Sequence, residues 1–270
     1  MIVKLAFAFG AGFISYFATQ IGIPFIFAFI IGIILTGLLG FILERTFLRP
    51  MVGEPVFSVA VLTIGIDILL RVVLDNWIGI NPKYMGDPFP SYGNFGSFNI
   101  AGLTVKYLEV TALITALMLI FVLSVFFKKS KYGVAMRATS LDQEAALAQG
   151  INVGRVFGLV WFIAGLLAAF AGFFITGGFN TLTNTSFISA LRALPAVVIG
   201  GLDSVTGAVV GSLIIGLTQA YVGYYQFDIE SAYNIKLGNG FSIVAPYVIM
   251  FVILIVKPDG LFGTEEVERV

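Results

Sequence analysis

The 270-residue chain contains no cysteine and no histidine. Without cysteine it has no disulfide framework and no thiol chemistry. Without histidine it lacks the commonest metal ligand and the side chain that most often moves protons near neutral pH. It also has no Gly-x-x-x-x-Gly-Lys-Ser/Thr run, so it carries no P-loop for ATP. We therefore expect no enzyme activity, no bound metal and no cofactor in this chain.

Charged residues are scarce as well. They make up 11% of the chain, against about a quarter in ordinary soluble domains. Apolar residues make up 59%, and the mean hydropathy is +1.01. So few charges cannot cover a water-exposed surface, and so many apolar residues do not remain disordered. The fifteen basic and fifteen acidic residues balance, so nucleic acid is not an expected partner.

The sequence is instead dominated by long apolar runs. A helix needs about 20 mostly apolar residues to cross a bilayer. Continuous runs, rather than alternating ten-residue strands, predict an all-α polytopic membrane bundle and not a β-barrel. The eight candidate segments are Ile2–Thr19, Pro24–Leu43, Val56–Leu74, Tyr107–Phe127, Val156–Thr176, Phe187–Gly201, Val205–Gly223 and Phe241–Val256.

Basic residues set the expected orientation, because Lys and Arg favour the cytoplasmic side. With the first residue in the cytoplasm and the segments alternating, ten basic residues fall on the inner side and three on the outer side. Both termini are then cytoplasmic. The first run, with Lys4 ahead of it, is alternatively a signal peptide, but no small-x-small cleavage site follows it.

Charges inside apolar segments cost about 2.5 to 3.5 kcal/mol each on insertion scales. Asp67 and Arg71 share the segment Val56–Leu74 and are four residues apart, hence on one helix face. The pair either lines a pathway or forms a structural ion pair, and the position of Arg71 near the outer end favours the second reading. Arg192 lies in the short run Phe187–Gly201, which suggests a re-entrant or broken helix. It either packs helices together or lines a pathway.

Two loops stand out between the segments. The external stretch 75–106 is rich in Gly, Pro and Asn, and its two β-prone runs around Ala101-Gly102 predict a small hairpin. It is either a docking surface or lid, or a plain connector. In the internal stretch 128–155, Ser140 and Gln143 predict a capping box, and Gly150 predicts a left-handed stop. The helix Ser140–Gln149 is too short to be stable alone, so it must pack on its own bundle or on a partner.

Five motifs run through the chain in a consistent order. They are Glu44-Arg45 with Arg49-Pro50; Arg137-Ala138 with Ala146, Gly150-Ile151 and Arg155; the small-residue stretch 165–172; Gly200-Gly201-Leu202-Asp203-Ser204-Val205-Thr206-Gly207; and Lys257-Pro258-Asp259-Gly260-Leu261-Phe262-Gly263. Together they resemble the inner-membrane permeases of ABC importers of the branched-chain amino acid type.

This resemblance implies a single permease domain over residues 1–270 that moves branched-chain amino acids. Urea, short amides or a sugar are alternative substrates, and an ion-coupled secondary transporter is a further alternative. The implied partners are cytoplasmic ATP-binding subunits, a second permease subunit of the same or a sister type, and an external solute-binding protein. The implied coupling residues are Arg137, Ala138, Ser140, Gln143, Ala146, Gly150, Ile151 and Arg155. Family members begin with further membrane sequence, so we expect the chain to lack an N-terminal portion of the family.

Overall fold

The computed structural model describes residues 2–51, 54–78, 83–84, 96–100, 103–177, 181–182, 193–202, 204–234, 238 and 241–263. The chain divides into two compact units, Met1–Phe187 and Ile188–Val270. We call them the first and the second unit and describe each by itself.

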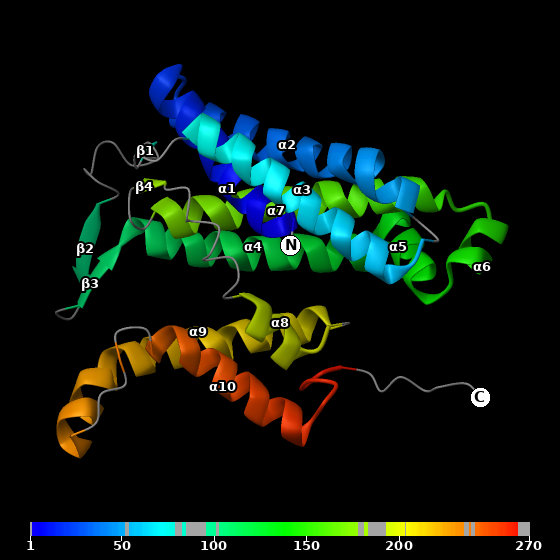
Figure 1. Ribbon diagram of the computed structural model, residues 1–270. Helices are drawn as coiled ribbons and strands as arrows, with labels where there is room; N and C mark the ends of the chain where they lie inside the picture. Colours follow the sequence, from blue (N-terminus) through cyan, green and yellow to red (C-terminus); the bar gives the residue numbers. More distant parts are fainter. Residues whose placement is uncertain are drawn as a thin grey trace. The chain divides into compact units, whose positions relative to one another are not determined.

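Helices make up most of the first unit (Figure 1). The described residues of the unit also form four short strands in two antiparallel pairs. Strand β1 (Lys83–Tyr84) pairs with β4 (Thr181–Leu182), and β2 (Ser97–Ile100) pairs with β3 (Leu103–Lys106). The helices are α1 (Ile2–Ser15), which continues as the π-helical turn η1 (Tyr16–Gln20); α2 (Phe25–Leu43), which continues as η2 (Glu44–Leu48) and η3 (Arg49–Met51); α3 (Val56–Ile78); α4 (Tyr107–Lys129); α5 (Lys131–Leu141); α6 (Gln143–Ala148); and α7 (Val153–Gly177).

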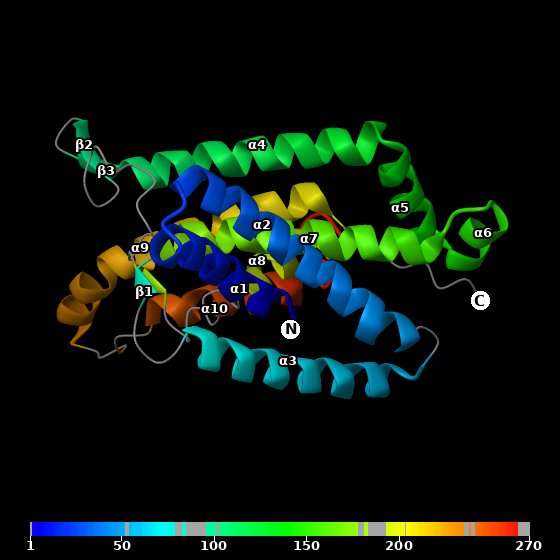
Figure 2. The same cartoon turned by 90° about the horizontal axis from the view of Figure 1, so that it is seen from above.

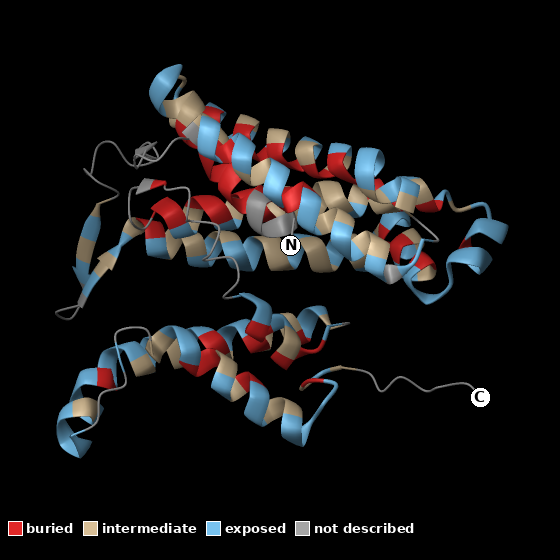
Figure 3. Cartoon of the chain, in the orientation of Figure 1, coloured by how far each residue is buried: buried red, intermediate tan, exposed pale blue. Residues whose placement is uncertain are grey.

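Helices α1, α2 and α7 form the core of the first unit. They make the most extensive helix contacts in it, and their inner faces carry much of its buried surface (Figure 3). Small residues hold the backbones close together: Gly10 lies on Ala169, and Gly172 lies on the backbone of Phe7. About two turns earlier on α7, Gly165 lies on the backbone of Thr36. In a lipid solvent such close approach is the main source of helix association, because apolar side chains gain little by leaving lipid.

Helices α3 and α4 lie on opposite sides of this core (Figure 2). The most apolar part of α4 contains no buried residue, and that of α3 contains few. Large apolar side chains such as Ile68, Val72, Leu117 and Phe121 are exposed on them. Such faces are compatible with lipid and not with water, as the composition predicts.

Among the described residues, five helical stretches are long and apolar enough to cross a membrane. They are Phe25–Met51, Phe57–Trp77, Tyr107–Lys129, Val153–Gly177 and Val205–Tyr233, and α10 (Phe241–Val256) is a shorter apolar helix. The expectation of an all-α polytopic membrane protein is confirmed. The count of about eight segments is not, because α1 and α8 (Ala193–Gly200) are short. Arg192 and part of the run Phe187–Gly201 lie outside the described residues.

The two loop regions lie at opposite ends of the first unit. Strands β2 and β3 form the predicted hairpin, with Ser97 opposite Lys106 and Ile100 opposite Leu103. Figures 1 and 2 both place this hairpin at the end of α4 that is remote from α5 and α6. A bilayer across the bundle would therefore separate the hairpin from α6. Most of the rest of the stretch 75–106 lies outside the described residues.

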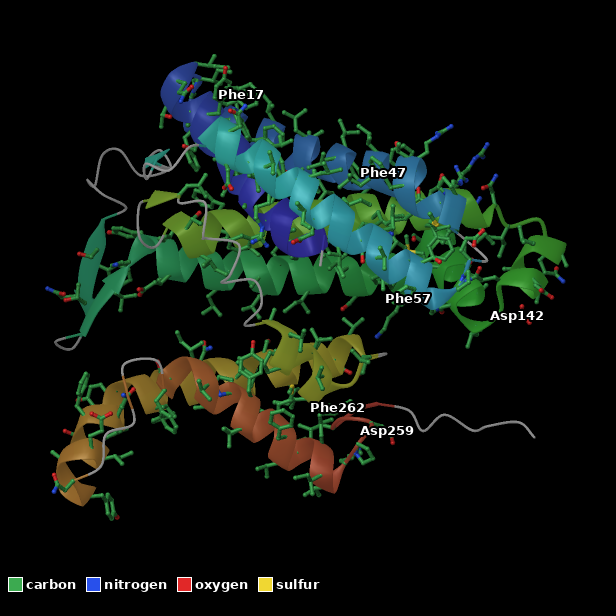
Figure 4. The ribbon with its side chains drawn as sticks, viewed as in Figure 1. Phe17, Phe47, Phe57, Asp142, Asp259 and Phe262 are labelled. Carbon is green, nitrogen blue, oxygen red and sulfur yellow. The ribbon has the colours of Figure 1, made fainter. Side chains whose placement is uncertain are left out.

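In the second unit, two of the sequence motifs contact each other: the Lys257–Gly263 motif and the motif that begins at Gly200. It consists of α8, α9 (Val205–Tyr233) and α10. After α10 the chain turns back, and the amide of Leu261 donates a hydrogen bond to the carbonyl of Ile199 at 2.7 Å. The amide of Phe262 donates to the carbonyl of Gly200 at 3.0 Å, and Figure 4 labels Phe262 in this turn. The turn of the Lys257–Gly263 motif is thus bound to the Gly-Gly corner between α8 and α9.

The close contact at Gly172 predicts a stability effect. A methyl group there would overlap the carbonyl oxygen of Phe7, which is backbone and cannot rotate away. We expect Gly172→Ala to destabilise the purified protein by about 1–3 kcal/mol, the usual cost of overpacking. The control is Gly65→Ala on α3, where nothing lies within 4 Å. The melting temperature in detergent measures both, and equal values would contradict the close α1–α7 contact.

Candidate functional site

Helix α6 begins later than the sequence predicted. Its N-cap is Asp142, whose Oδ1 accepts a hydrogen bond from the Ala145 amide at 2.9 Å. Ser140 instead lies in the last turn of α5, where its hydroxyl donates to the carbonyl of Arg137 at 2.9 Å. The expected capping box of Ser140 and Gln143 is therefore wrong. Asp142 is the better acceptor because its extended backbone leaves α5 and points the carboxylate back at α6.

The end of α6 matches the expectation. Gly150 has a φ of +80°, a left-handed conformation that glycine adopts without strain. Its amide donates to the Leu147 carbonyl at 2.9 Å, and the Ile151 amide donates to the Ala146 carbonyl at 3.0 Å. These two bonds make a Schellman motif. Asn152 then caps α7 by accepting from the amide of Arg155 at 3.0 Å, so only a few residues connect α6 to α7.

A tight corner connects α5 to α4. Ser130 caps α5 by accepting from the amide of Gly133 at 2.8 Å, and Gly133 lies directly on the carbonyls of Phe126 and Phe127. The guanidinium of Arg137 donates to the carbonyl of Phe127. A cation at the last carbonyls of a helix satisfies an orphan acceptor and complements the helix dipole. Arg137 therefore fixes the angle between α4 and α5.

The surface of α6 is almost entirely open. Ala146 is its only buried residue. Leu141, just before α6, is 88% exposed, and Leu147 is 58% exposed. Figure 4 shows Asp142 at the far end of the first unit, beside α6. Leu141 at the end of α5 and Leu147 on α6 are therefore apolar surface that the described part of the unit leaves uncovered.

The remaining residues predicted for coupling lie along the same segment. The carbonyl of Ala138 accepts from the amide of Asp142 at 3.1 Å. Gln143 is exposed in the first turn of α6, Ile151 is half-buried, and the side chain of Arg155 is exposed. The predicted set thus lies along α5, α6 and the beginning of α7, and Asp142 is the cap residue that the sequence reasoning missed.

Asp67 and Arg71 form the ion pair that their spacing predicts. The guanidinium Nη2 of Arg71 lies 3.2 Å from Oδ2 of Asp67, and the two side chains are 42% and 2% exposed. The partly exposed arginine next to a buried carboxylate is compatible with the structural reading. Arg192, the third charge considered for a pathway, lies outside the described residues.

Two further charged residues lie at the end of α2, and sequence reasoning gave them no role at a site. Glu44 is 3% exposed, and its side chain lies against α7 at Gly158. The guanidinium of Arg49 lies over Gly154. The signal that could have found them is an acidic residue at the very end of an apolar run. No cluster of acidic side chains that could hold a metal occurs among the residues described.

The long apolar helices and the exposed corner at α6 define a polytopic helical membrane protein with a structured loop region at one end. The chain belongs to the family described as branched-chain amino acid transport system / permease component, whose model matches residues 3–256. It is therefore a permease component of a membrane transport system.

Several relatives cover most of this chain. A high-affinity branched-chain amino acid transport system permease protein of Pseudomonas aeruginosa, BraD, is 26% identical over 244 residues, covering 90% of this chain and 76% of the relative. The permease LivH of Salmonella typhimurium is 29% identical over 248 residues, covering 90% and 75%. A galactose/methyl galactoside import permease of Haemophilus influenzae is 30% identical, but over only 51% of this chain. No solved structure is detectably similar.

The two possible caps of α6 give opposite predictions. Removing an N-cap acceptor costs about 1 kcal/mol, or roughly fivefold in a local opening equilibrium. We expect Asp142→Ala to speed hydrogen exchange of the amides in Gln143–Ala148 by about that factor. Ser140→Ala is expected to leave it unchanged. Mass spectrometry of the exchanging protein in detergent measures both, and the reverse ranking would restore the Ser140 cap.

The structural reading of the ion pair is also testable. Arg71→Leu removes a partner of a buried carboxylate, and we expect a loss of stability of about 1–3 kcal/mol. Asp67→Asn in the same chain removes the buried charge and is expected to restore most of that loss. The melting temperatures of the single and double variants measure this. Loss of uptake in a double variant that is fully stable would show that the pair lines the pathway instead.

Proposed function

We propose that this chain forms the transmembrane pathway of an ATP-driven importer of branched-chain amino acids, and that α6 is its coupling helix. Its membership of the permease family and the relatives named above support the substrate class. The observation that carries the coupling role is the open apolar surface of Leu141 and Leu147 at the end of the bundle. A groove on a cytoplasmic ATP-binding subunit would cover these side chains and remove them from water.

The connections of α6 suit this role. On one side the α5 corner, fixed by Arg137 on the Phe127 carbonyl, connects α6 to α4. On the other side the Schellman turn and Asn152 connect it to α7. A displacement of α6 by nucleotide-driven closure of the partner therefore reaches two long helices directly. One of them, α7, belongs to the three-helix core.

The proposal extends to the whole complex and its orientation. The chain would pair with a second permease, of the same or a sister type, and receive substrate from an external solute-binding protein. The basic residues favour α6 and both termini in the cytoplasm. The hairpin β2–β3, at the other end of the first unit, would then face outward, where such a binding protein docks.

Sugar permeases are weaker guides to the substrate. The sugar import relatives match about half of this chain, whereas the branched-chain amino acid permeases match about nine-tenths of it.

The coupling role is tested by charge placed on the two exposed leucines at the end of α5 and on α6. We expect Leu141→Glu and Leu147→Glu each to weaken binding of the ATP-binding subunit by tenfold or more, because loss of a hot-spot anchor costs about 2 kcal/mol or more. Gln149→Glu adds the same charge at an exposed position at the end of α6 and is the matched control. Pull-down of the ATP-binding subunit and leucine uptake by reconstituted vesicles measure the effect.

Two outcomes would contradict the proposal. One is normal binding and uptake in both leucine variants at normal protein levels. The other is substrate uptake by the permease alone, driven by an ion gradient without any ATP-binding subunit. The second result would favour a secondary transporter.

A further inference from the structure

The end of α2 contains a short π-helical segment, η2. Its hydrogen bond runs from the amide of Arg49 to the carbonyl of Glu44, five residues back. In an α-helix, residues five apart lie about 140° apart around the axis. The widened turn brings residues five apart closer to one face, and π-bulges of this kind are frequent at functional sites. The segment thus turns Glu44 and Arg49 toward the same neighbour.

That neighbour is the beginning of α7. Gly154 and Gly158 are four residues apart, so they form two notches on one face of the helix. The guanidinium of Arg49 fills the first notch so closely that a methyl group at Gly154 would overlap it. Glu44 and Phe41 fill the second notch, where a methyl group would lie 2.6 Å from the Phe41 ring and 3.4 Å from Oε2 of Glu44.

The burial of Glu44 against α7 costs free energy and therefore needs an explanation. Glu44 is 3% exposed, and its Oε2 receives no hydrogen bond from the described residues. A buried carboxylate oxygen without a donor costs free energy that an apolar residue in the same place would avoid. Plain packing of α2 on α7 needs no charge, as the contacts of Gly40 with Trp161 and of Gly165 with Thr36 show further along the same helices.

The location supplies the explanation. Arg49 contacts α7 at Gly154, in the first turn of that helix. Gly154 is two residues after Asn152, the cap of α7, and four residues after Gly150, where α6 ends. Any movement of α6 enters α7 at this turn. We infer that Glu44 and Arg49 form a latch that ties the first two turns of α7 to α2, so that the displacement of the coupling helix moves α7 and α2 together. Both are positioning residues, and the latch rests on the proposed function.

A latch makes a prediction that packing alone does not. Arg49→Gln removes the guanidinium, and Gly154→Ala pushes it out of its notch at little structural cost, because the displaced group is the free end of a flexible side chain. Both variants remove one and the same contact. Their effects must therefore not add, and the double variant must resemble either single variant.

The matched control is Arg45→Gln. Arg45 is in the same π-helical segment and carries the same charge, but it is exposed and does not fill either α7 notch. Arg49→Lys, which keeps the charge on a shorter side chain without the planar guanidinium, tests the need for the guanidinium itself.

The experiment uses the full complex of both permease subunits, the ATP-binding subunits and the solute-binding protein in vesicles. We measure the amount of assembled complex, its ATPase rate with and without leucine-loaded binding protein, and leucine uptake per assembled complex. In Arg49→Gln and Gly154→Ala we expect normal assembly and basal ATPase, with uptake and stimulation by the binding protein both lower by about tenfold, within the usual range of coupling between sites. Arg45→Gln should behave as the wild type.

Three outcomes would overturn the latch. The first is wild-type uptake in Arg49→Gln and Gly154→Ala. The second is a double variant whose loss is the product of the two single losses. The third is a loss of assembly that accounts for the whole loss of uptake, because the contact would then be structural. Failure of the proposed function looks different, since Leu147→Glu would then leave ATPase stimulation and uptake unchanged as well.

Discussion

The structure of the first unit depends on close backbone contact between α1, α2 and α7. In lipid, apolar side chains gain little by touching one another, so helices associate where small residues let their backbones approach. Gly10 and Gly172 provide this between α1 and α7, and Gly165 provides it between α2 and α7. The result is a three-helix core to which α3 and α4 are attached at the sides. The short helix α6 is connected to this core through α7 and, through α5, to α4.

The helix ends around α5, α6 and α7 depend on polar cap residues rather than on close backbone packing. The caps of α5, α6 and α7 are Ser130, Asp142 and Asn152, and all three use side chains to satisfy helix amides that neither lipid nor a neighbouring helix could satisfy. Rigid caps make α6 a defined body in spite of its length of six residues. Its one buried residue is the small Ala146, while Leu147 on the same helix is exposed.

The sequence alone determined the fold class and most helix positions. Long apolar runs must be helical in a bilayer, because no water satisfies their backbone groups, and Gly150 could end α6 because left-handed backbone favours glycine. The hairpin around Ala101-Gly102 followed from local β propensity in the same way. The short helix α6 and its turn were predictable because the residues that form them are close together in sequence.

Only the tertiary structure decided which side chains meet. Ser140 and Asp142 are both good cap residues, and the choice between them depends on where α5 ends, which the corner between Arg137 and Phe127 controls. The contacts of Glu44 and Arg49 with α7 join residues more than a hundred positions apart and require a π-helical turn. Local helix propensity does not predict such a contact, because the notch at Gly154 exists only after α2 and α7 have packed together.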